Sequence, residues 1–245
     1  MNRSVGSDAH ITIIKTSSKI VEMICVKTVN DKHTVKFRII ESCDFEETVD
    51  LCCNLFVNNE PITKSLKINY QEFRRFVEPY LLKAIADRIS IIAIDNHGTI
   101  VGFVISEPLM TIPPYLQGIS HKFAPIQNFL EELKYIYFAK YQYYYWELFQ
   151  ILHIVLLGVK DEYKNQQIGM NLIRENLKLA KLYNFSLVIS EVTGLKSQSV
   201  FRKIGFQEEV ILNYDSYVFN GDKIFSSIKE STSCSLMSYR INTIH

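Results

Sequence analysis

The sequence predicts an α/β fold in which helices flank a mixed sheet. Short β-branched runs alternate with segments of helical period along most of the chain. Two β-rich runs, 89–95 and 99–108, are joined by Asn96-His97-Gly98, which is a strong hairpin signal. With 245 residues and 47% hydrophobic content, the chain can bury a core without disulfides or metal.

The N-terminal segment, residues 1–34, is predicted to be an extension. Its two short apolar runs, 11–14 and 20–26, would form edge strands. The main domain is predicted over residues 35–245. It begins with an alternating strand, 35–40, followed by a helix that ends before Pro61, because the residue before a proline is pushed out of the α region.

The remaining elements follow in order. Further helices are predicted over 70–85, 126–145, 168–184 and 195–203. Further strands are predicted over 149–159 and 186–192, through 210–212, and over 234–241. The run 149–159 is apolar and β-branched enough to be a buried central strand.

Composition excludes several classes of function. A net charge of +1 offers no broad basic field for nucleic acid. The longest apolar stretch, 148–159, is shorter than the roughly 18 residues of a membrane span, and no secretion signal is visible. Five cysteines without metal-ligand spacing predict a reducing, cytoplasmic location and no metal. The oligomeric state cannot be predicted from the sequence.

One strand-loop-helix unit, residues 155–170, has the pattern of a phosphate site. Gly158 interrupts the strand, a polar loop follows, and Gly169 lies in the first turn of the next helix. Such a unit directs unpaired backbone N–H groups and the positive helix end at one point, which suits a pyrophosphate. An ordinary crossover connection would give the same pattern.

The segment Lys164-Asn-Gln-Gln-Ile-Gly169 resembles the acetyl-CoA motif of the GNAT acetyltransferase superfamily, usually written Arg/Gln-x-x-Gly-x-Gly/Ala. The segment TGLKSQSVFRKIGF, which starts at Thr193, resembles the family's downstream segment. Lys164 replaces Arg or Gln, and Gln167 stands at the first glycine position, where its Cβ narrows the approach to the phosphates.

Within that superfamily, residues 34–241 look most like the insect-type arylalkylamine (dopamine) N-acetyltransferases. The resemblance implies a single domain with a mostly antiparallel sheet, and transfer of an acetyl or longer acyl group from acyl-CoA to a primary amine in a ternary complex. The acceptor would be a small molecule such as an arylalkylamine or a polyamine. The residues that would bind the cofactor are Leu157, Gly158, Val159, Lys164, Asn165, Gln166, Gln167, Ile168, Gly169, Met170 and Phe201.

Three residues would carry the chemistry. A primary amine with a pKa near 10 is mostly protonated at pH 7, so a base must take a proton before it attacks. By the resemblance, Glu60 is that base, and Thr193 and Ser197 are the hydroxyl groups that assist the leaving sulfur. Each also has a structural interpretation: Glu60 at a helix terminus, and Thr193 and Ser197 as capping residues.

Aromatic residues crowd the segment 135–149. Rings could hold an arylalkylamine or contact its ammonium. Core packing would account for most of them, but we expect Tyr143, Tyr145 and Trp146, together with Phe56, to line the acceptor pocket. His153 is expected to be a hydrogen-bonded core histidine.

Two other functions remain open. Gln167 and the replacement of the family's usual tyrosine by Phe201 would fit a catalytically impaired CoA-binding or interaction module. A protein lysine or N-terminal acetyltransferase would need an open peptide groove, which the insertion 109–146 is expected to cover.

Overall fold

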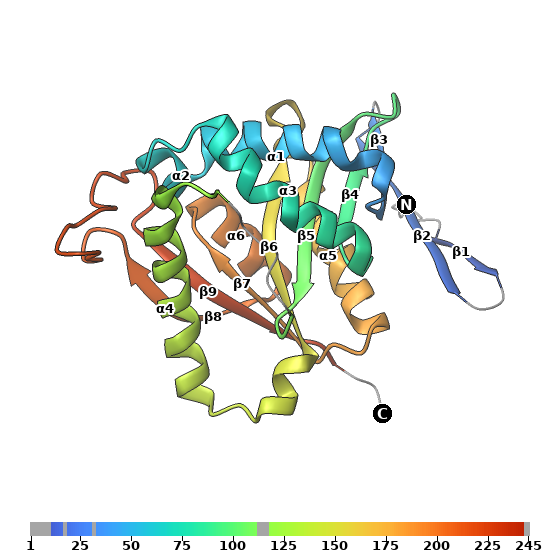
Figure 1. Ribbon diagram of the computed structural model, residues 1–245. Coiled ribbons are helices and arrows are strands. Elements are labelled where there is room, and N and C mark those ends of the chain that lie inside the picture. Colours follow the sequence, from blue (N-terminus) through green and yellow to red (C-terminus); the bar gives the residue numbers. More distant parts are fainter. Residues whose placement is uncertain (1–10, 17–18, 31–32, 112–117, 243–245) are drawn as a thin grey trace, which may run out of the picture.

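A mixed sheet forms the centre of the molecule, as the sequence predicts (Figure 1). The computed structural model describes residues 11–16, 19–30, 33–111 and 118–242. Within these residues the sheet has nine strands in the order β1-β2-β3-β4-β5-β6-β7-β9-β8. The pairing of β6 with β7 is parallel, and every other pairing is antiparallel.

The strands follow the predicted runs closely. They are β1 (Ile11–Thr16), β2 (Lys19–Asn30), β3 (His33–Ile39), β4 (Ile91–Ile94), β5 (Ile100–Pro108), β6 (Ile151–Val159), β7 (Leu187–Val192), β8 (Gln207–Asn213) and β9 (Ser233–Arg240). The two apolar runs of the N-terminal segment become β1 and β2, and β2 pairs with β3. The segment therefore continues the sheet as an edge hairpin.

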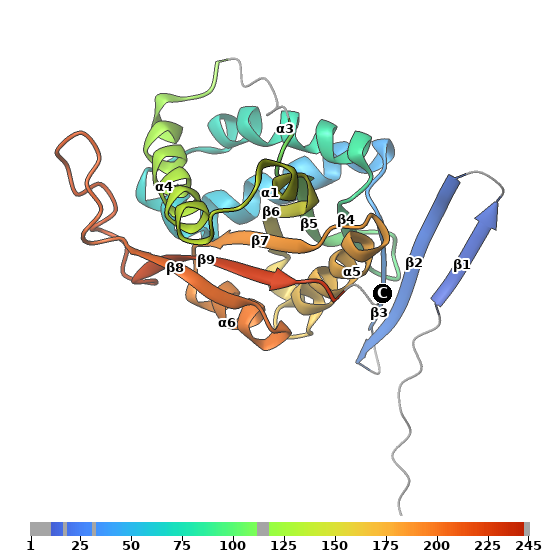
Figure 2. The same cartoon turned by 90° about the horizontal axis from the view of Figure 1, so that it is seen from below.

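The helices cover both faces of the sheet. They are α1 (Phe45–Asn59), α2 (Pro61–Ser65), α3 (Tyr70–Asp87), α4 (Ala124–Tyr141), α5 (Ile168–Leu182) and α6 (Leu195–Ile204). Figure 2 shows α1, α3 and α4 on one face and α5 and α6 on the other.

Two separate apolar cores lie on the first face. The α1/α3 core packs residues such as Val49 and Phe73 against the strand residue Phe103. The α4 core packs residues such as Phe129 against Ile189 of β7. These side chains are almost fully buried, and burial of one such side chain stabilises the fold by about 1.5–3 kcal/mol.

Two predicted boundaries are wrong. The helix predicted over 126–145 ends at Tyr141, because Gln142 takes a left-handed conformation (φ 49°) and donates its N–H to the carbonyl of Phe138. A 3-10 helix, η3 (Tyr145–Gln150), follows, so β6 starts two residues later than predicted. The short helix α2 was not predicted, although Pro61 at its first position is a common helix start.

None of the described helices is both long enough and apolar enough to span a membrane.

Candidate functional site

The strands β6 and β7 separate in the middle of the sheet. Their parallel pairing covers only three residue pairs, from Ile151–Leu187 to His153–Ile189, although β6 continues to Val159. The register of β6 with β5 shifts between Ile105 and Ser106, so Val155 is an extra residue in the ladder. Beyond this bulge β6 stays paired with β5, and its other edge has no partner strand within the described residues.

The open edge of β6 leads to the N-terminus of α5. A 3-10 turn, η4 (Asp161–Tyr163), connects the two elements. No side chain caps α5, and its first helical bond runs from Asn171 N–H to the carbonyl of Gln167 at 2.9 Å. The N–H groups of Ile168, Gly169 and Met170 thus precede the first helical donor, the N–H of Asn171, and such groups at a helix N-terminus favour an anion.

The backbone of the loop supports the resemblance to the acetyl-CoA motif. Gln167 has a φ of 59°, a left-handed conformation that favours glycine, which is the residue of the motif at this position; Asn165 is also left-handed, with a φ of 64°. At Gly169 an added Cβ would lie 3.7 Å from Val159, an ordinary contact. Packing therefore does not require glycine at 169, and the bare backbone leaves space for a phosphate.

The other predicted cofactor residues lie around this loop in different environments. Leu157 and Val159 are half-buried against the α5 side of the sheet. Gly158 faces the opposite side, where an added Cβ would lie 2.6 Å from the ring of Phe103. Ile168 is buried in the core.

Three more predicted cofactor residues are two polar residues of the loop and one buried ring on α6. Lys164 forms an ion pair with Asp161 at 2.5 Å. The Gln166 side-chain oxygen is buried without a hydrogen-bond partner. Phe201 is buried, with its ring 4.8 Å from that of Phe206, so it belongs to the packing under α6.

An open cavity of about 360 Å³ lies between α1 and the same loop. Four of the residues that line it are acidic: Glu47, Asp50, Asp161 and Glu162. Clustered carboxylates repel phosphate, so this cavity does not suit the anionic part of CoA. The α5 N-terminus and the open edge of β6 suit it better.

The fold brings together the loops that carry the three predicted catalytic residues. Glu60 precedes α2, and Thr193 and Ser197 flank the start of α6. A Cβ placed on Gly194 would lie 3.9 Å from the ring of Pro61 and 3.5 Å from Ser197 Oγ. Residues more than 130 positions apart in the chain, Pro61 and Gly194, thus lie side by side.

Glu60 and Ser197 both make capping contacts. The two carboxylate oxygens of Glu60 accept N–H groups of Ile62 and Thr63, at 3.1 and 2.6 Å. Ser197 Oγ donates to the carbonyl of Gly194 at 2.8 Å. A carboxylate oxygen can accept more than one hydrogen bond, so the cap orients Glu60 without using its full capacity.

Two buried side chains hold the turn between β7 and α6. The Tyr214 hydroxyl donates to the Thr193 carbonyl at 2.7 Å. Gln198 Nε2 donates to the carbonyls of Val192 and Ser233, at 3.1 and 3.0 Å. The hydrogen bonds of Tyr214 and Gln198 therefore fix the position of Thr193.

The thiols nearby are poor nucleophiles. Burial raises the pKa of the Cys234 thiol well above its usual range, and the charges of Glu191 and Glu60 raise it further. Burial likewise raises the pKa of Cys52, and that of Cys53 to about 12. These thiols stay protonated at neutral pH, which disfavours a cysteine nucleophile.

Two of the four predicted acceptor-pocket aromatics, Tyr143 and Tyr145, lie away from Glu60. Tyr143 shares a 2.8 Å hydroxyl contact with Tyr137 on α4, and Tyr145 is 66% exposed. Both precede β6, at the end opposite the α5 loop (Figure 1), so the structure does not bring them to Glu60. Phe56 stacks on Phe73 in the α1/α3 core. The side chain of Trp146 lies outside the described part of the structure.

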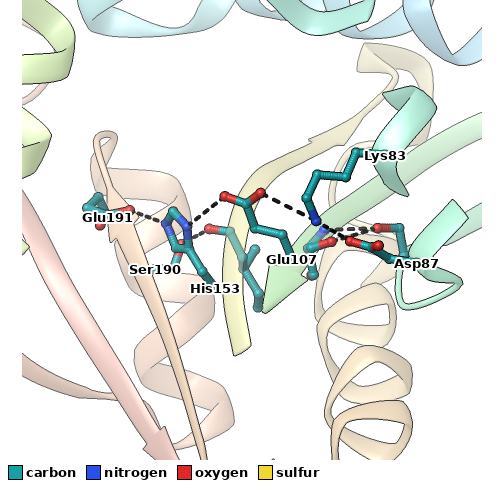
Figure 3. A network of polar contacts seen from close by, with 9 residues as sticks. Lys83, Asp87, Glu107, His153, Ser190 and Glu191 are labelled. Carbon is teal, nitrogen blue, oxygen red and sulfur yellow. Dashed lines mark hydrogen bonds and ion pairs between the residues drawn. The ribbon is translucent and has the colours of Figure 1, made fainter. Parts of the chain in front are cut away.

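A buried charged cluster is the feature that the sequence analysis missed. Figure 3 shows His153 between Glu191 and Glu107, with Lys83 and Asp87 beyond. His153 Nε2 lies 2.6 Å from Glu191 Oε2, so the expectation of a hydrogen-bonded core histidine is confirmed. The sequence does carry a signal for this cluster, because each of three apolar strands contains one ionisable residue.

This cluster has a defined charge state. Burial by itself lowers the pKa of His153, but the charge of Glu191 and hydrogen bonds to Glu107 and Glu191 outweigh it and raise that pKa to about 9. For Glu191, burial acts to raise the pKa, and the His153 charge outweighs it and lowers the pKa. The pair is therefore an ion pair at neutral pH.

Within the described residues, no group of three or more His, Cys, Asp or Glu side chains is arranged to hold a metal ion.

Comparisons with known proteins agree on the fold. No protein-family model and no curated protein matches the sequence. Among solved structures, arylalkylamine N-acetyltransferase 7 of the mosquito Aedes aegypti has a TM-score of 0.72 and 20% identity, over 99% of this chain and 100% of that one. The C-terminal condensation domain of Ebony, solved with β-alanyl-dopamine, has a TM-score of 0.76 and 16% identity, over 84% and 99%.

A third similar structure names the superfamily. It is a GNAT superfamily phosphinothricin acetyltransferase of Sinorhizobium meliloti in complex with acetyl-CoA, with a TM-score of 0.54 and 11% identity, over 84% of this chain and 88% of that one. The strand order, the separation of β6 from β7 and these similarities lead to one conclusion: the chain has the GNAT acetyltransferase fold.

Proposed function

We propose that this protein transfers an acetyl or other acyl group from acyl-CoA to the primary amine of a small molecule. The observation that carries the proposal is the contact between Pro61, next to Glu60, and the turn at Gly194, between Thr193 and Ser197, in a fold that also leaves one edge of β6 open. The α5 N-terminus, reached directly from that edge, supports binding of the pyrophosphate. The mosquito protein compared above carries the name of an arylalkylamine N-acetyltransferase, and this supports an amine acceptor.

Bound acyl-CoA would supply an activated acyl carbonyl. The N–H groups of Ile168, Gly169 and Met170 would hold its phosphates, and the unpaired backbone of β6 would align its extended amide-bearing arm. Leu157 and Val159 would exclude water on the α5 side of that edge.

Glu60 would accept a proton from the acceptor ammonium, directly or through one water. The neutral amine nitrogen then bonds to the acyl carbon, the carbon–sulfur bond breaks, and the sulfur leaves with the electron pair of that bond. Ser197 or Thr193 would donate a hydrogen bond to the departing sulfur, and Ser197 must first turn away from the Gly194 carbonyl. The sulfur ends as a thiol, with one proton released overall.

A reducing, cytoplasmic location is part of the proposal. Cys43, Cys52, Cys53 and Cys234 are free in the described structure, and Cys52 and Cys53 are buried neighbours. Free thiols that persist in a protein are typical of reducing compartments.

The test combines binding with turnover. Acetyl-CoA at 100 times its Kd should stabilise the protein by about 2.7 kcal/mol, which a thermal shift detects. Thiol release is then measured with tyramine, dopamine, spermidine and a lysine peptide. Turnover with small amines and not with the peptide supports the proposal. Binding without turnover would instead indicate an impaired module, for which Gln167 and Phe201 give a reason.

The variant Glu60→Gln separates the base from the cap. The amide oxygen can still accept an N–H of α2, whereas the amide cannot take a proton, so kcat/KM should fall by about 10²–10⁴-fold at pH 7. The matched control is Glu46→Gln at the exposed start of α1, which should keep its activity. Unchanged turnover in Glu60→Gln would remove Glu60 from the mechanism.

A further inference from the structure

The loop between β6 and α5, residues 160–167, holds a conformation that its own residues do not favour. Asn165 and Gln167 both lie in the left-handed region, with φ values of 64° and 59°. Glycine adopts this region freely, whereas a residue with a Cβ is strained there, and asparagine tolerates it better than glutamine. Such strain persists where the surrounding structure holds the backbone in place. The contacts that hold this loop therefore bear on the N–H groups of α5 that follow it.

A long-range side-chain hydrogen bond joins the middle of the loop to the β4–β5 turn. The Tyr163 hydroxyl donates to Asp95 Oδ2 at 2.7 Å, across 68 positions of sequence. The ring of Tyr163 packs against the core on the α5 side of the sheet. The N–H of Lys160 donates to the carbonyl of Val101 at 2.8 Å and holds the start of the loop on β5. The loop is thus anchored at Lys160 and at Tyr163, before its two strained residues.

The Asp95 end of this bond is held by its own turn. Asp95 is 7% exposed, and its Oδ1 accepts the N–H groups of His97 and Thr99, each at 2.9 Å. Burial acts to raise the pKa of Asp95, but the hydrogen bonds from Tyr163, Thr99 and His97 outweigh it and lower that pKa. Asp95 is therefore a carboxylate at neutral pH, and a hydrogen bond to a charged acceptor is stronger than one between neutral groups.

The Tyr163–Asp95 bond lies close enough in the chain to act on Gln167. Tyr163 precedes Gln167 by four positions. Between them, Gln166 Nε2 donates to the carbonyl of Glu162 at 3.4 Å, which links the residue before Gln167 back to the turn that carries Tyr163. A shift of that turn would therefore move the start of α5.

We propose that Tyr163 and Asp95 are positioning residues for acyl-CoA: their hydrogen bond holds Gln167 in its left-handed conformation and keeps the first N–H groups of α5 directed at the CoA phosphates. The inference rests on the CoA site of the function proposed above, and it adds two residues that act through the loop backbone. A glycine at position 167 would reach the same conformation without strain. The Tyr163–Asp95 bond therefore compensates for the Cβ of Gln167.

Binding of CoA tests the inference before any turnover. The test variant is Tyr163→Phe, which removes the hydroxyl and keeps the ring in the core. The matched control is Tyr141→Phe, because the Tyr141 hydroxyl donates to a carboxylate oxygen of Glu209 at 2.5 Å, between α4 and β8. Calorimetry with CoA should give a Kd at least fivefold higher in Tyr163→Phe and an unchanged Kd in Tyr141→Phe. A wild-type Kd in Tyr163→Phe, or an equal loss of affinity in both variants, overturns the inference.

The variant Gln167→Gly separates positioning from a general loss of packing. Glycine takes the left-handed conformation without help, so removal of the Tyr163 hydroxyl in this background should change the Kd for CoA by less than twofold. A purely structural role would weaken CoA binding equally in the two backgrounds, and that result would overturn the inference. Melting temperatures measured without ligand establish that each variant is folded.

Turnover distinguishes the inference from the proposed function. With the amine that is acylated fastest, Tyr163→Phe should keep the wild-type kcat, while its KM for acetyl-CoA rises at least fivefold. A lower kcat with an unchanged KM overturns the positioning role and keeps the acyl transfer. Weaker CoA binding in Tyr163→Phe, in a protein that acylates none of the amines, keeps the positioning role and overturns the function. A wild-type protein that does not bind CoA overturns both.

Discussion

The buried ion pair of His153 and Glu191 makes stability depend on pH. The pKa of His153 is about 9 in the folded protein and 6.5 in an unfolded chain. A raised pKa stabilises the folded state fully below the unfolded value, and this stabilisation is lost as the pH rises through the folded value. The unfolding free energy should therefore fall between pH 6.5 and pH 9.

The size of the effect follows from the two values. The difference between 6.5 and about 9, at 1.36 kcal/mol per pKa unit, corresponds to about 3 kcal/mol. For a chain of this length, that change should lower the melting temperature by about 6–12 °C, or the urea midpoint by roughly 1 M. The lowered pKa of Glu191 acts in the opposite range, since its contribution is lost only as the pH falls below about 4.5.

Urea unfolding at pH 6, 7, 8 and 9 measures the effect. The buried thiols have raised pKa values and add a further loss only above about pH 9, so the series stops there. The control His97→Gln, in the exposed β4–β5 turn, should keep the pH dependence. Glu191→Gln should abolish it, because the main charge that holds the proton on His153 is gone. Constant or rising stability of the wild-type protein from pH 6.5 to 9 would refute the reasoning.

Three further substitutions test the fold around the site. Gln167→Gly should raise the unfolding free energy by up to about 1 kcal/mol and tighten acetyl-CoA binding, since glycine tolerates the φ of 59° and removes a Cβ; a lower urea midpoint would contradict this. Gly158→Ala should cost about 1–3 kcal/mol, because the new Cβ would lie 2.6 Å from Phe103, and an unchanged melting temperature would count against that contact. Asn176→Ala should also cost about 1–3 kcal/mol, since the buried Asn176 oxygen pairs with Ser106 Oγ at 3.0 Å, and urea unfolding checks it.

Local pattern was enough for most of the fold. The hairpin of β4 and β5 was visible because its turn residues are specific, and β6 because its apolar run is long. The end of α4 was missed because Gln142 takes a left-handed conformation that no glycine or proline announces. The bulge at Val155 follows from how β6 pairs with β5, which a single strand's sequence does not encode.

The candidate site likewise has one part that the sequence predicts and one part that it does not. The loop before α5 and the start of α6 could be located because motif spacing survives even where Gln167 replaces a glycine. The charged cluster could not be located. It depends on which face of the sheet each side chain takes, because Glu107, His153 and Glu191 come from three strands separated by dozens of residues.

The open stretch of β6 after Val155 has a consequence for handling the protein. Over this stretch one edge of β6 has no partner strand in the described structure, although β6 lies in the middle of the sheet. Unpaired strand edges can pair with strands of other molecules. A ligand that covers this edge would protect the protein from self-association as well as stabilise it. Light scattering on warming should therefore show later aggregation when CoA is present, even if no acyl group is ever transferred.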